Sequence, residues 1–378
     1  MLPTIQNQPL PDVIDLGLGD PALSLLPLDL IRDSAHRQLM QNNKSFLQYG
    51  AEQGDGHFIQ ALANFLTKGY GFEAKPENLF ITSGISNALD LACTLFTQAG
   101  DTIFVEEPTY FLALKIFADH RLNVIPIHTD ENGLVLESLE EKLAGYRPRF
   151  LYLIPTFHNP ASATLTQERR DRLGQLAIEH EFLIVADEVY HLLSYASQPP
   201  KSFAAYMNAE NVLSLGSFSK ILAPGLRLGW LQAHSKTIKR FTTCGLLDSG
   251  GGLNPFTSAM IRDALETGGL ENHIDNLIQI YRSRRDILDA ALRQHIPQLQ
   301  YMTPQGGYFL WARLPAHLNA NELRRKALAF KVDFRPGTLF SSRNGLENYL
   351  RLCFIHYEAE ELQAGVLRLK ECLQEAGS

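Results

Sequence analysis

Little in the sequence places the protein outside a cell or in a membrane. Its 378 residues include only four cysteines, which lie far apart and form no CxxC pair. Such spacing indicates free thiols in a reducing compartment rather than disulfides or a metal site. No apolar run is long enough to cross a bilayer, and the first residues lack the features of a signal peptide. We therefore expect a soluble cytoplasmic protein.

Basic residues are outnumbered by acidic ones. The chain has 34 Lys and Arg against 41 Asp and Glu, a net charge of −7. This balance argues against a general affinity for nucleic acid or for anionic membranes. The sequence contains no internal repeat and no low-complexity tract. A hydrophobic fraction of 45% over this length is enough for a large core and suggests two domains.

Short apolar runs alternate with amphipathic helical stretches over residues 45–280. The predicted buried strands are residues 78–84, 101–108, 122–128, 149–157, 182–190, 211–219 and 226–233. Stretches such as "SNALDLACTLF" and "TQERRDRLGQLAIEHE" between them have helical periodicity. The alternation predicts an α/β domain with a mostly parallel, seven-stranded central sheet flanked by helices.

The pattern changes after residue 280. The helical stretch "YRSRRDILDAALRQHI", the strand patterns "GGYFLWARL" and "NYLRLCFIH", and a C-terminal amphipathic helix predict a smaller α+β domain. We expect residues 1–44 to join residues 281–378 in this domain, because the N-terminal segment is too short for a core of its own. Residues 45–280 then form the large domain.

Polar residues cluster at the ends of the predicted strands, which is where parallel sheets bind ligands. They are Ser83, Gly84, Tyr110, Asn159, Asp187, Tyr190, Ser217, Ser219 and Lys220. Taken singly, each has an ordinary structural explanation, such as a helix cap, a turn residue or a core aromatic. Their joint placement at strand ends favours a binding site.

One segment, "SFSKILAPGLRLGW" (217–230), places Lys220 and Arg227 among apolar residues. Burying unpaired charge is costly, so these cations are either solvated on a surface turn or paired with an anionic ligand. The segment resembles the lysine motif of fold-type I pyridoxal-phosphate enzymes, specifically the class I/II aminotransferases. An arginine seven positions after the lysine is similar to the aminoadipate-aminotransferase branch and to the effector domains of MocR-type regulators. "YGAEQGDGHFIQALANFL", "PTFHNPAS" and "GGYFLW" extend the resemblance over nearly the whole chain.

The resemblance implies the cofactor pyridoxal 5'-phosphate and assigns roles around its ring. Lys220 would form the Schiff base with the cofactor aldehyde and then move a proton at the substrate Cα. Asp187 would keep the pyridine nitrogen protonated, and Tyr110 would stack on the ring. Asn159 and Tyr190 would bind the 3' oxygen.

The phosphate would be held by a second group of residues. The resemblance assigns it to the turn Ser83–Gly84, the backbone N–H groups of Ile85 and Ser86 at a helix N-terminus, and the side chains of Ser217, Ser219 and Arg227. Tyr49 would reach the phosphate of a neighbouring subunit, which implies a homodimer with shared sites. Two departures are "NPAS" in place of the commoner "NPTG", and Asn87 after the phosphate turn.

For the substrate, the resemblance implies that Arg351 in "NYLRLCF" clamps the α-carboxylate, close to Gly19 and Asn159. Leucines in "LGLGDPALSLLPLDLI" favour apolar or aromatic amino donors, and no second arginine is clearly placed for an acidic side chain. The branch also contains aminoadipate enzymes, so the donor stays open. The glycine-rich "SGGGLNPF" (249–256) indicates close backbone approach near the site or a subunit interface.

The sequence therefore predicts an aminotransferase that moves an amino group from an L-amino acid to a 2-oxo acid by ping-pong kinetics. A β-lyase or another pyridoxal-phosphate reaction on the same scaffold is the alternative, because fold alone does not fix reaction type. A MocR-like ligand sensor would need a basic DNA-binding domain before the pattern that begins by residue 14. The acidic balance also argues against that reading.

Overall fold

An eight-stranded sheet lies at the centre of the larger part of the protein. The computed structural model describes residues 5–7, 9–196 and 198–376. The strand order is β2-β9-β8-β7-β6-β3-β4-β5. The strands are β2 (Leu79–Thr82), β3 (Thr102–Glu107), β4 (Asn123–Asp130), β5 (Gly133–Leu134), β6 (Phe150–Leu153), β7 (Leu183–Asp187), β8 (Val212–Ser217) and β9 (Gly229–Gln232).

Strands β8, β7, β6, β3 and β4 run parallel, whereas β9 is antiparallel to both of its neighbours and β5 is antiparallel to β4. The prediction of an α/β fold with a mostly parallel sheet is confirmed. The prediction of seven strands misses β5, because two residues after a tight turn are too short to show a periodic pattern. Strands β6, β8 and β9 are fully buried, which explains their continuous apolar runs.

Helices flank this sheet and connect its strands. They are α2 (Gly56–Tyr70), α3 (Ile85–Phe96), α4 (Phe111–Asp119), α5 (Leu136–Gly145), α6 (Gln167–Glu179), α7 (Ser235–Thr242), α8 (Gly245–Gly250) and α9 (Pro255–Glu266). Local sequence fixes several helix ends. Asp55 caps α2 by accepting from the N–H of Phe58, and Gly71 ends that helix at a positive φ of 72°. Thr166 caps α6 in the same way as Asp55.

Two small sheets form a second group of elements. Strand β13 (Tyr349–Cys353) lies between β10 (Phe309–Arg313) and β12 (Arg335–Pro336). Strand β1 (Ile14–Asp15) pairs in parallel with β11 (Val332–Asp333), which ties the N-terminal segment to the C-terminal part. Three helices complete the group, namely α10 (Gly269–His295), α11 (Ala320–Ala327) and α12 (Ala359–Ala376).

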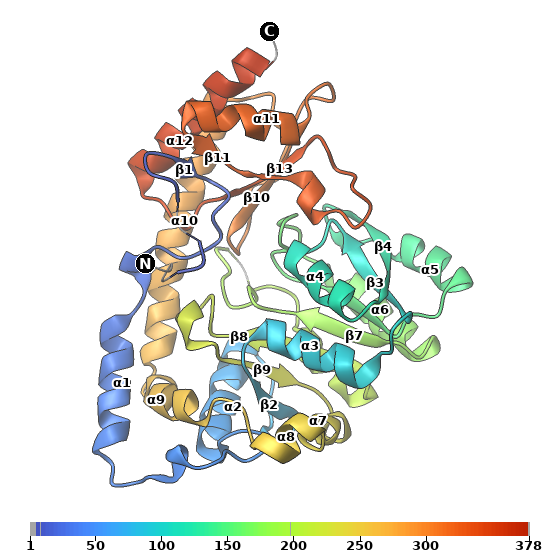
Figure 1. Ribbon diagram of the computed structural model, residues 1–378, viewed down its shortest axis with the longest axis vertical. Coiled ribbons are helices and arrows are strands. Elements are labelled where there is room, and N and C mark those ends of the chain that lie inside the picture. Colours follow the sequence, from blue (N-terminus) through green and yellow to red (C-terminus); the bar gives the residue numbers. More distant parts are fainter. Residues whose placement is uncertain (1–4, 8, 197, 377–378) are drawn as a thin grey trace.

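Helix α10 connects the two groups, packing on α9 at one end and on α12 at the other (Figure 1). The helix predicted from Tyr281 begins at Gly269, because twelve further residues continue its amphipathic pattern upstream. The predicted domain boundary at residue 280 therefore falls within α10. The first long helix, α1 (Leu28–Met40), packs against α9. The division into residues 45–280 and 1–44 plus 281–378 stays a prediction, and residues 1–4, 8, 377 and 378 lie outside the described part.

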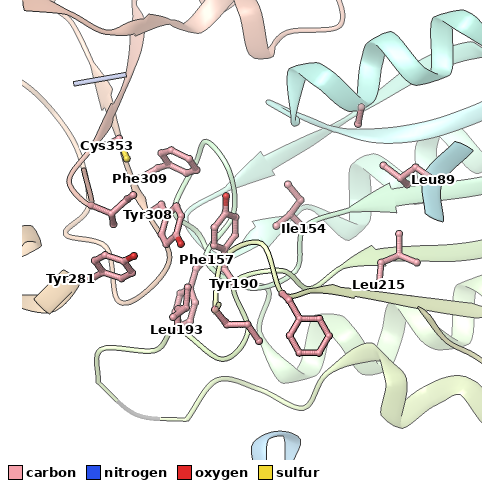
Figure 2. Close-up of a cluster of buried hydrophobic side chains, with 14 of the residues drawn as sticks. Leu89, Ile154, Phe157, Tyr190, Leu193, Leu215, Tyr281, Tyr308, Phe309 and Cys353 are labelled. Atoms are coloured by element: carbon pink, nitrogen blue, oxygen red, sulfur yellow. The ribbon is translucent and has the colours of Figure 1, made fainter. Parts of the chain in front are cut away.

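A buried aromatic cluster lies beyond the carboxyl ends of the parallel strands and joins the two groups (Figure 2). The Tyr308 ring lies 5.2 Å from the Tyr190 ring and 5.4 Å from the Tyr281 ring. Phe309 meets Tyr190 edge-on at 6.0 Å. This contact holds the segment before β10 against the loop after β7, where the predicted site residues lie.

Across the described residues no helix is long and apolar enough to cross a membrane. All four cysteines are free thiols, as the sequence predicts.

Candidate active site

Lys220 and Arg351 both reach the backbone of one N-terminal segment. The Lys220 Nζ donates to the carbonyl of Gly19 at 3.2 Å, and Arg351 Nη2 donates to the carbonyl of Gly17 at 2.7 Å. Lys220 follows β8 in the large sheet, whereas Arg351 lies in β13 of the small one. Segment 17–19 thus covers a place where an amine group and a guanidinium from the two parts of the chain converge.

Arg351 is almost completely buried in an aromatic frame. Its guanidinium lies 3.9 Å from the Phe309 ring centroid and 5.0 Å from that of Phe340. Burial lowers the pKa of Arg351 to about 10. Its Nη1 donates to Asn159 Oδ1 at 2.9 Å, and its Nε has no hydrogen-bond partner among the described residues. A buried guanidinium with a free donor suits a carboxylate ligand.

Asp187 ends β7 and is 3% exposed. Tyr152 donates its hydroxyl to Asp187 Oδ2 at 2.9 Å, and the N–H of Val189 donates to Oδ1 at 3.3 Å. Burial raises the pKa of Asp187 to about 6, against these hydrogen bonds and against the nearby charge of Lys220. Asp187 forms no ion pair within the described residues, so this buried carboxylate is expected to take a cationic partner from a ligand.

Burial also lowers the pKa of Lys220, and Asp187 and Asp20 oppose that effect electrostatically. The Lys220 ammonium lies 5.3 Å from the Tyr308 ring centroid. The Tyr308 hydroxyl donates to the Lys220 carbonyl at 2.8 Å, which fixes the backbone from which the lysine side chain extends. The structure therefore brings Lys220 within electrostatic range of Asp187.

The remaining predicted ring contacts lie around these groups. Asn159 and Tyr190 are 5% and 3% exposed, and Tyr110 is the N-cap residue of α4. Burial raises the pKa of Tyr110 to about 12, with a further contribution from the charge of Asp187. The Tyr190 pKa is well above its ordinary value for the same reason. Both hydroxyls therefore keep their protons at neutral pH and can donate hydrogen bonds.

The β2–α3 turn forms a cradle for an anion. Gly84, at a φ of 84°, is the N-cap of α3 and has no side chain to cap the N–H groups of Ile85 and Ser86. A Cβ on Gly84 would lie 2.9 Å from Arg227 Nη2 and fill the cradle. The N–H of Ser83 donates to Asn87 Oδ1 at 3.1 Å, so Asn87 holds the turn from inside the helix. Open N–H groups at a helix N-terminus bind phosphate well.

Strand β8 and the segment after it supply the other predicted phosphate donors. Ser217 Oγ donates to Ser219 Oγ at 2.9 Å, and the N–H of Ser219 donates back to Ser217 Oγ at 3.1 Å. Arg227 Nη2 donates to the carbonyl of Ser83 at 3.4 Å, which places its guanidinium beside the α3 N-terminus. The donor set fits the phosphate end of pyridoxal phosphate, and Asp187 fits its ring nitrogen.

Tyr49 is not part of this cluster within one chain. Its side chain is 84% exposed on the surface next to the short 3-10 helix η2 (Ser45–Leu47). Its expected contact with a neighbouring subunit stays a prediction, as do the individual roles of the residues above.

Sequence reasoning missed a buried ion pair behind the site. Arg170 of α6 is fully buried, with Nη1 3.9 Å from Glu188 Oε1. Arg170 donates to the carbonyls of Leu165 and Pro155 and to the hydroxyl of Thr156 at 2.7–2.9 Å, which braces the loop that carries Asn159. Its surroundings, "QERRDRL", look like an exposed helix face. Glu188, directly after Asp187, is the one residue whose place in the sequence could have indicated this buried ion pair.

Comparison with known proteins points to one family. The model of aminotransferase class I and II matches residues 11–369. An aromatic-amino-acid aminotransferase of Thermococcus litoralis is 35% identical over 372 residues, covering 96% of this chain and 88% of that one. The crystal structure of Pyrococcus horikoshii kynurenine aminotransferase, with PMP, has a TM-score of 0.91 at 33% identity and covers 97% and 92% of the two chains.

A third relative adds a cofactor adduct. The alpha-aminoadipate aminotransferase of Thermus thermophilus, complexed with N-(5'-phosphopyridoxyl)-L-leucine, has a TM-score of 0.87 at 30% identity. The alignment covers 97% of this chain and 93% of that one. These findings confirm the predicted resemblance over nearly the whole chain.

Proposed function

The chain belongs to the class I and II aminotransferases and uses pyridoxal 5'-phosphate, and we propose that its amino donors are L-amino acids with apolar or aromatic side chains. The protein is an aminotransferase by family membership. The proposal concerns the donor, the roles of the site residues and the assembly.

The convergence of Lys220 and Arg351 on segment 17–19 carries the proposal. The α-amino and α-carboxylate groups of an amino acid are separated by a single carbon, so a site for them needs an amine-handling group and a carboxylate-binding group side by side. Lys220 Nζ and Arg351 Nη2 reach carbonyls two residues apart in the same segment. A bidentate guanidinium binds a carboxylate with defined orientation, which presents the Cα to Lys220.

The bound cofactor supplies an electrophilic aldehyde and a ring that accepts the electron pair released at the substrate Cα. Asp187 holds a proton on the ring nitrogen. Lys220, whose pKa burial lowers, carries a proton to and from the substrate Cα. Asn159 and Tyr190 hold the ring oxygen, and the β2–α3 turn with Ser217, Ser219 and Arg227 holds the phosphate. Donor and acceptor use one site in turn, which gives ping-pong kinetics.

Aromatic surroundings support the choice of donor. Phe340, which flanks Arg351, also meets Phe111 at 5.3 Å and Trp311 at 5.6 Å, both edge-on. Leu23, at the start of a short 3-10 helix after segment 17–19, is 74% exposed. Apolar walls bind apolar side chains mainly through burial of their surface. Two relatives are named for aromatic amino acids and for kynurenine, which agrees with this choice.

A donor screen tests the proposal. The holoenzyme is incubated with single L-amino acids and the absorbance of its cofactor is followed in the absence of a 2-oxo acid. We expect phenylalanine, tyrosine, leucine or kynurenine to change the spectrum faster than glutamate, aspartate or 2-aminoadipate. A preference for 2-aminoadipate would overturn the donor assignment but not the family. Lys220→Ala is expected to abolish amino transfer from every donor to a 2-oxo acid, because no group then moves the proton at the substrate Cα, whereas Lys239→Ala, in the exposed part of α7, serves as the matched control.

We further propose a homodimer in the cytoplasm, without nucleic-acid partners. Large apolar side chains are exposed to solvent on α1, on and directly after η2, and at the start of α9. They include Leu39 (57% exposed), Met40 (73%), Leu47 (66%), Tyr49 (84%) and Phe256 (50%). An apolar surface of this kind is typical of an interface between subunits. The free thiols agree with a reducing compartment, and the net charge of −7 with the absence of nucleic-acid binding.

A further inference from the structure

The glycine-rich stretch 249–256 has no role in the mechanism above. It connects α8, which ends at Gly250, with α9, which begins at Pro255. Its backbone pairs with the segment that follows Tyr49. The N–H of Gly252 donates to the carbonyl of Gly50 at 2.7 Å, and the two residues form an isolated antiparallel bridge.

Two of the three consecutive glycines are required by this pairing. A Cβ on Gly252 would lie 1.8 Å from the carbonyl oxygen of Ala51, and one on Gly251 would lie 2.7 Å from that of Gly50. Gly251 also has a φ of 72°, which L side chains rarely adopt. In contrast, a Cβ on Gly250 would meet nothing within 4 Å. The close approach is therefore confined to residues 251 and 252.

The pairing of Gly252 with Gly50 places Asn254 beside the β2–α3 turn, the cradle described above for an anion. Asn254 has a φ of 52°, a conformation that asparagine tolerates better than most residues. Its side-chain Nδ2 donates to the carbonyl of Arg227 at 2.7 Å and to Ser83 Oγ at 3.1 Å, with the carbonyl of Thr82 at 3.4 Å. One amide group thus links the turn after β2 to the turn before β9.

We propose that Asn254 is a positioning residue for the phosphate of the cofactor. It holds Ser83 and Arg227 at a fixed separation, and Gly251 and Gly252 allow the loop to come close enough to place it there. The inference rests on the proposed function, because it requires that the cradle hold a phosphate.

The structure of the turn that carries Arg227 explains why a positioning residue is needed there. Arg227 follows a short 3-10 helix, η5 (Pro224–Leu226), and itself has a φ of 47°, so its turn has few backbone hydrogen bonds to fix it. Its guanidinium otherwise contacts the carbonyls of Pro224 and Ser83 at 3.2 and 3.4 Å. Anchoring the Arg227 carbonyl limits the motion of the side chain before the anion binds. A preorganised donor set binds more tightly because less ordering accompanies binding.

The test compares pyridoxal phosphate with pyridoxal, which lacks the phosphate. Full-length protein freed of cofactor is titrated with each compound, and the dissociation constants are measured by absorbance. The variants are Asn254→Gly and Asn254→Asp, because both residues tolerate a positive φ and neither donates from a side-chain amide. We expect pyridoxal phosphate to bind about tenfold more weakly to Asn254→Gly, equivalent to about 1.4 kcal/mol, with pyridoxal binding unchanged. Asn254→Asp adds a negative charge and is expected to lose more.

A second readout uses inorganic phosphate alone. Phosphate is expected to raise the melting temperature of the cofactor-free wild-type protein, and to raise that of the Asn254 variants less. Gly252→Ala is expected to behave like Asn254→Gly, whereas Gly250→Ala serves as its matched control and should bind like the wild type. Should Gly252→Ala fail to fold, the two Asn254 variants still decide the question.

Two results would overturn the inference. One is unchanged binding of pyridoxal phosphate by both Asn254 variants. The other is an equal loss for pyridoxal phosphate and pyridoxal, which would indicate a general structural role. A wild-type protein that binds neither compound would instead contradict the cofactor assignment itself, so the two failures are distinguishable.

Discussion

Arg351 of the small sheet and Asn159, in the loop after β6 of the large sheet, are joined by a hydrogen bond of 2.9 Å, from Nη1 to Oδ1. The residue expected to bind the substrate carboxylate is therefore oriented by a residue expected to contact the cofactor ring. Each of the two parts of the chain contributes one partner. The position of Arg351 thus depends on how the parts sit together, and not only on its own strand.

We expect Asn159→Asp to weaken the binding of every amino donor. A carboxylate at this position would pair with Arg351, raise the lowered pKa of that guanidinium and compete with the substrate carboxylate. A charge-assisted hydrogen bond contributes about 1.5–3 kcal/mol, so KM should rise about 10- to 150-fold. Steady-state kinetics with leucine and phenylalanine checks this. The rise should be the same for both donors, and a rise for one alone would contradict a role at the α-carboxylate.

Asp187→Asn is expected to stabilise the cofactor-free protein at neutral pH. Burial raises the pKa of Asp187 from 3.8 to about 6, so the folded chain holds this proton more tightly than the unfolded chain. The unfolding free energy therefore falls as pH rises from about 4 to 6, by up to about 3 kcal/mol from this group. Asparagine carries no such charge and can still accept from Tyr152. The variant should match the wild type at pH 4 and exceed it at pH 7.

Chemical denaturation of the cofactor-free proteins at several pH values measures this difference. Asp275→Asn, at an exposed position in α10, is the control and should show no comparable trend. With cofactor bound, the order should reverse, because the wild-type carboxylate gains a cationic partner and the neutral amide of the variant does not. A stability difference that does not change with pH would contradict the role of burial.

The sequence predicts the parallel strands well because most of them are short and largely buried apolar runs, with β6 and β8 buried along their whole length. Polar residues at their ends, such as Asp187 and Ser217, could be located for the same reason: parallel strands deliver their carboxyl ends to one edge. Residues whose role depends on contacts with residues distant in sequence could not be located in this way. The charged pattern around Arg170 looks solvated, but in the fold the loop 155–165 and residues of the segment after β7 contact its guanidinium. Asn254 is likewise 171 residues from Ser83 along the chain, and no periodicity links them.

Arg170→Met is expected to destabilise the protein strongly. The change leaves Glu188 buried without its cation and removes donors from the carbonyls of Leu165 and Pro155. Breaking a buried pair in this way costs about 3–5 kcal/mol. Burial already raises the pKa of Glu188, and the loss of Arg170 would raise it further. The cost should therefore shrink as pH is lowered, because the folded state then holds a protonated, neutral Glu188.

Denaturant unfolding of four proteins tests this: wild type, Arg170→Met, Glu188→Gln and the double variant. We expect the double variant to be more stable than the sum of the single changes allows, because it leaves no unpaired charge. Strict additivity would show that the two side chains do not interact at 3.9 Å.

Mixed dimers test whether Tyr49 serves the neighbouring subunit. We expect Tyr49→Phe to weaken cofactor binding through loss of a hydroxyl on the phosphate, and Lys220→Ala to be inactive. In a hybrid of the two, the subunit with an intact Lys220 would receive a wild-type Tyr49 from its partner. Random pairing of equal amounts makes half of the dimers hybrids with one complete site each, so about a quarter of the wild-type sites should return. The assay is run at a cofactor concentration that leaves Tyr49→Phe largely empty. If Tyr49 instead acts within its own chain, no hybrid contains a complete site and mixing restores nothing.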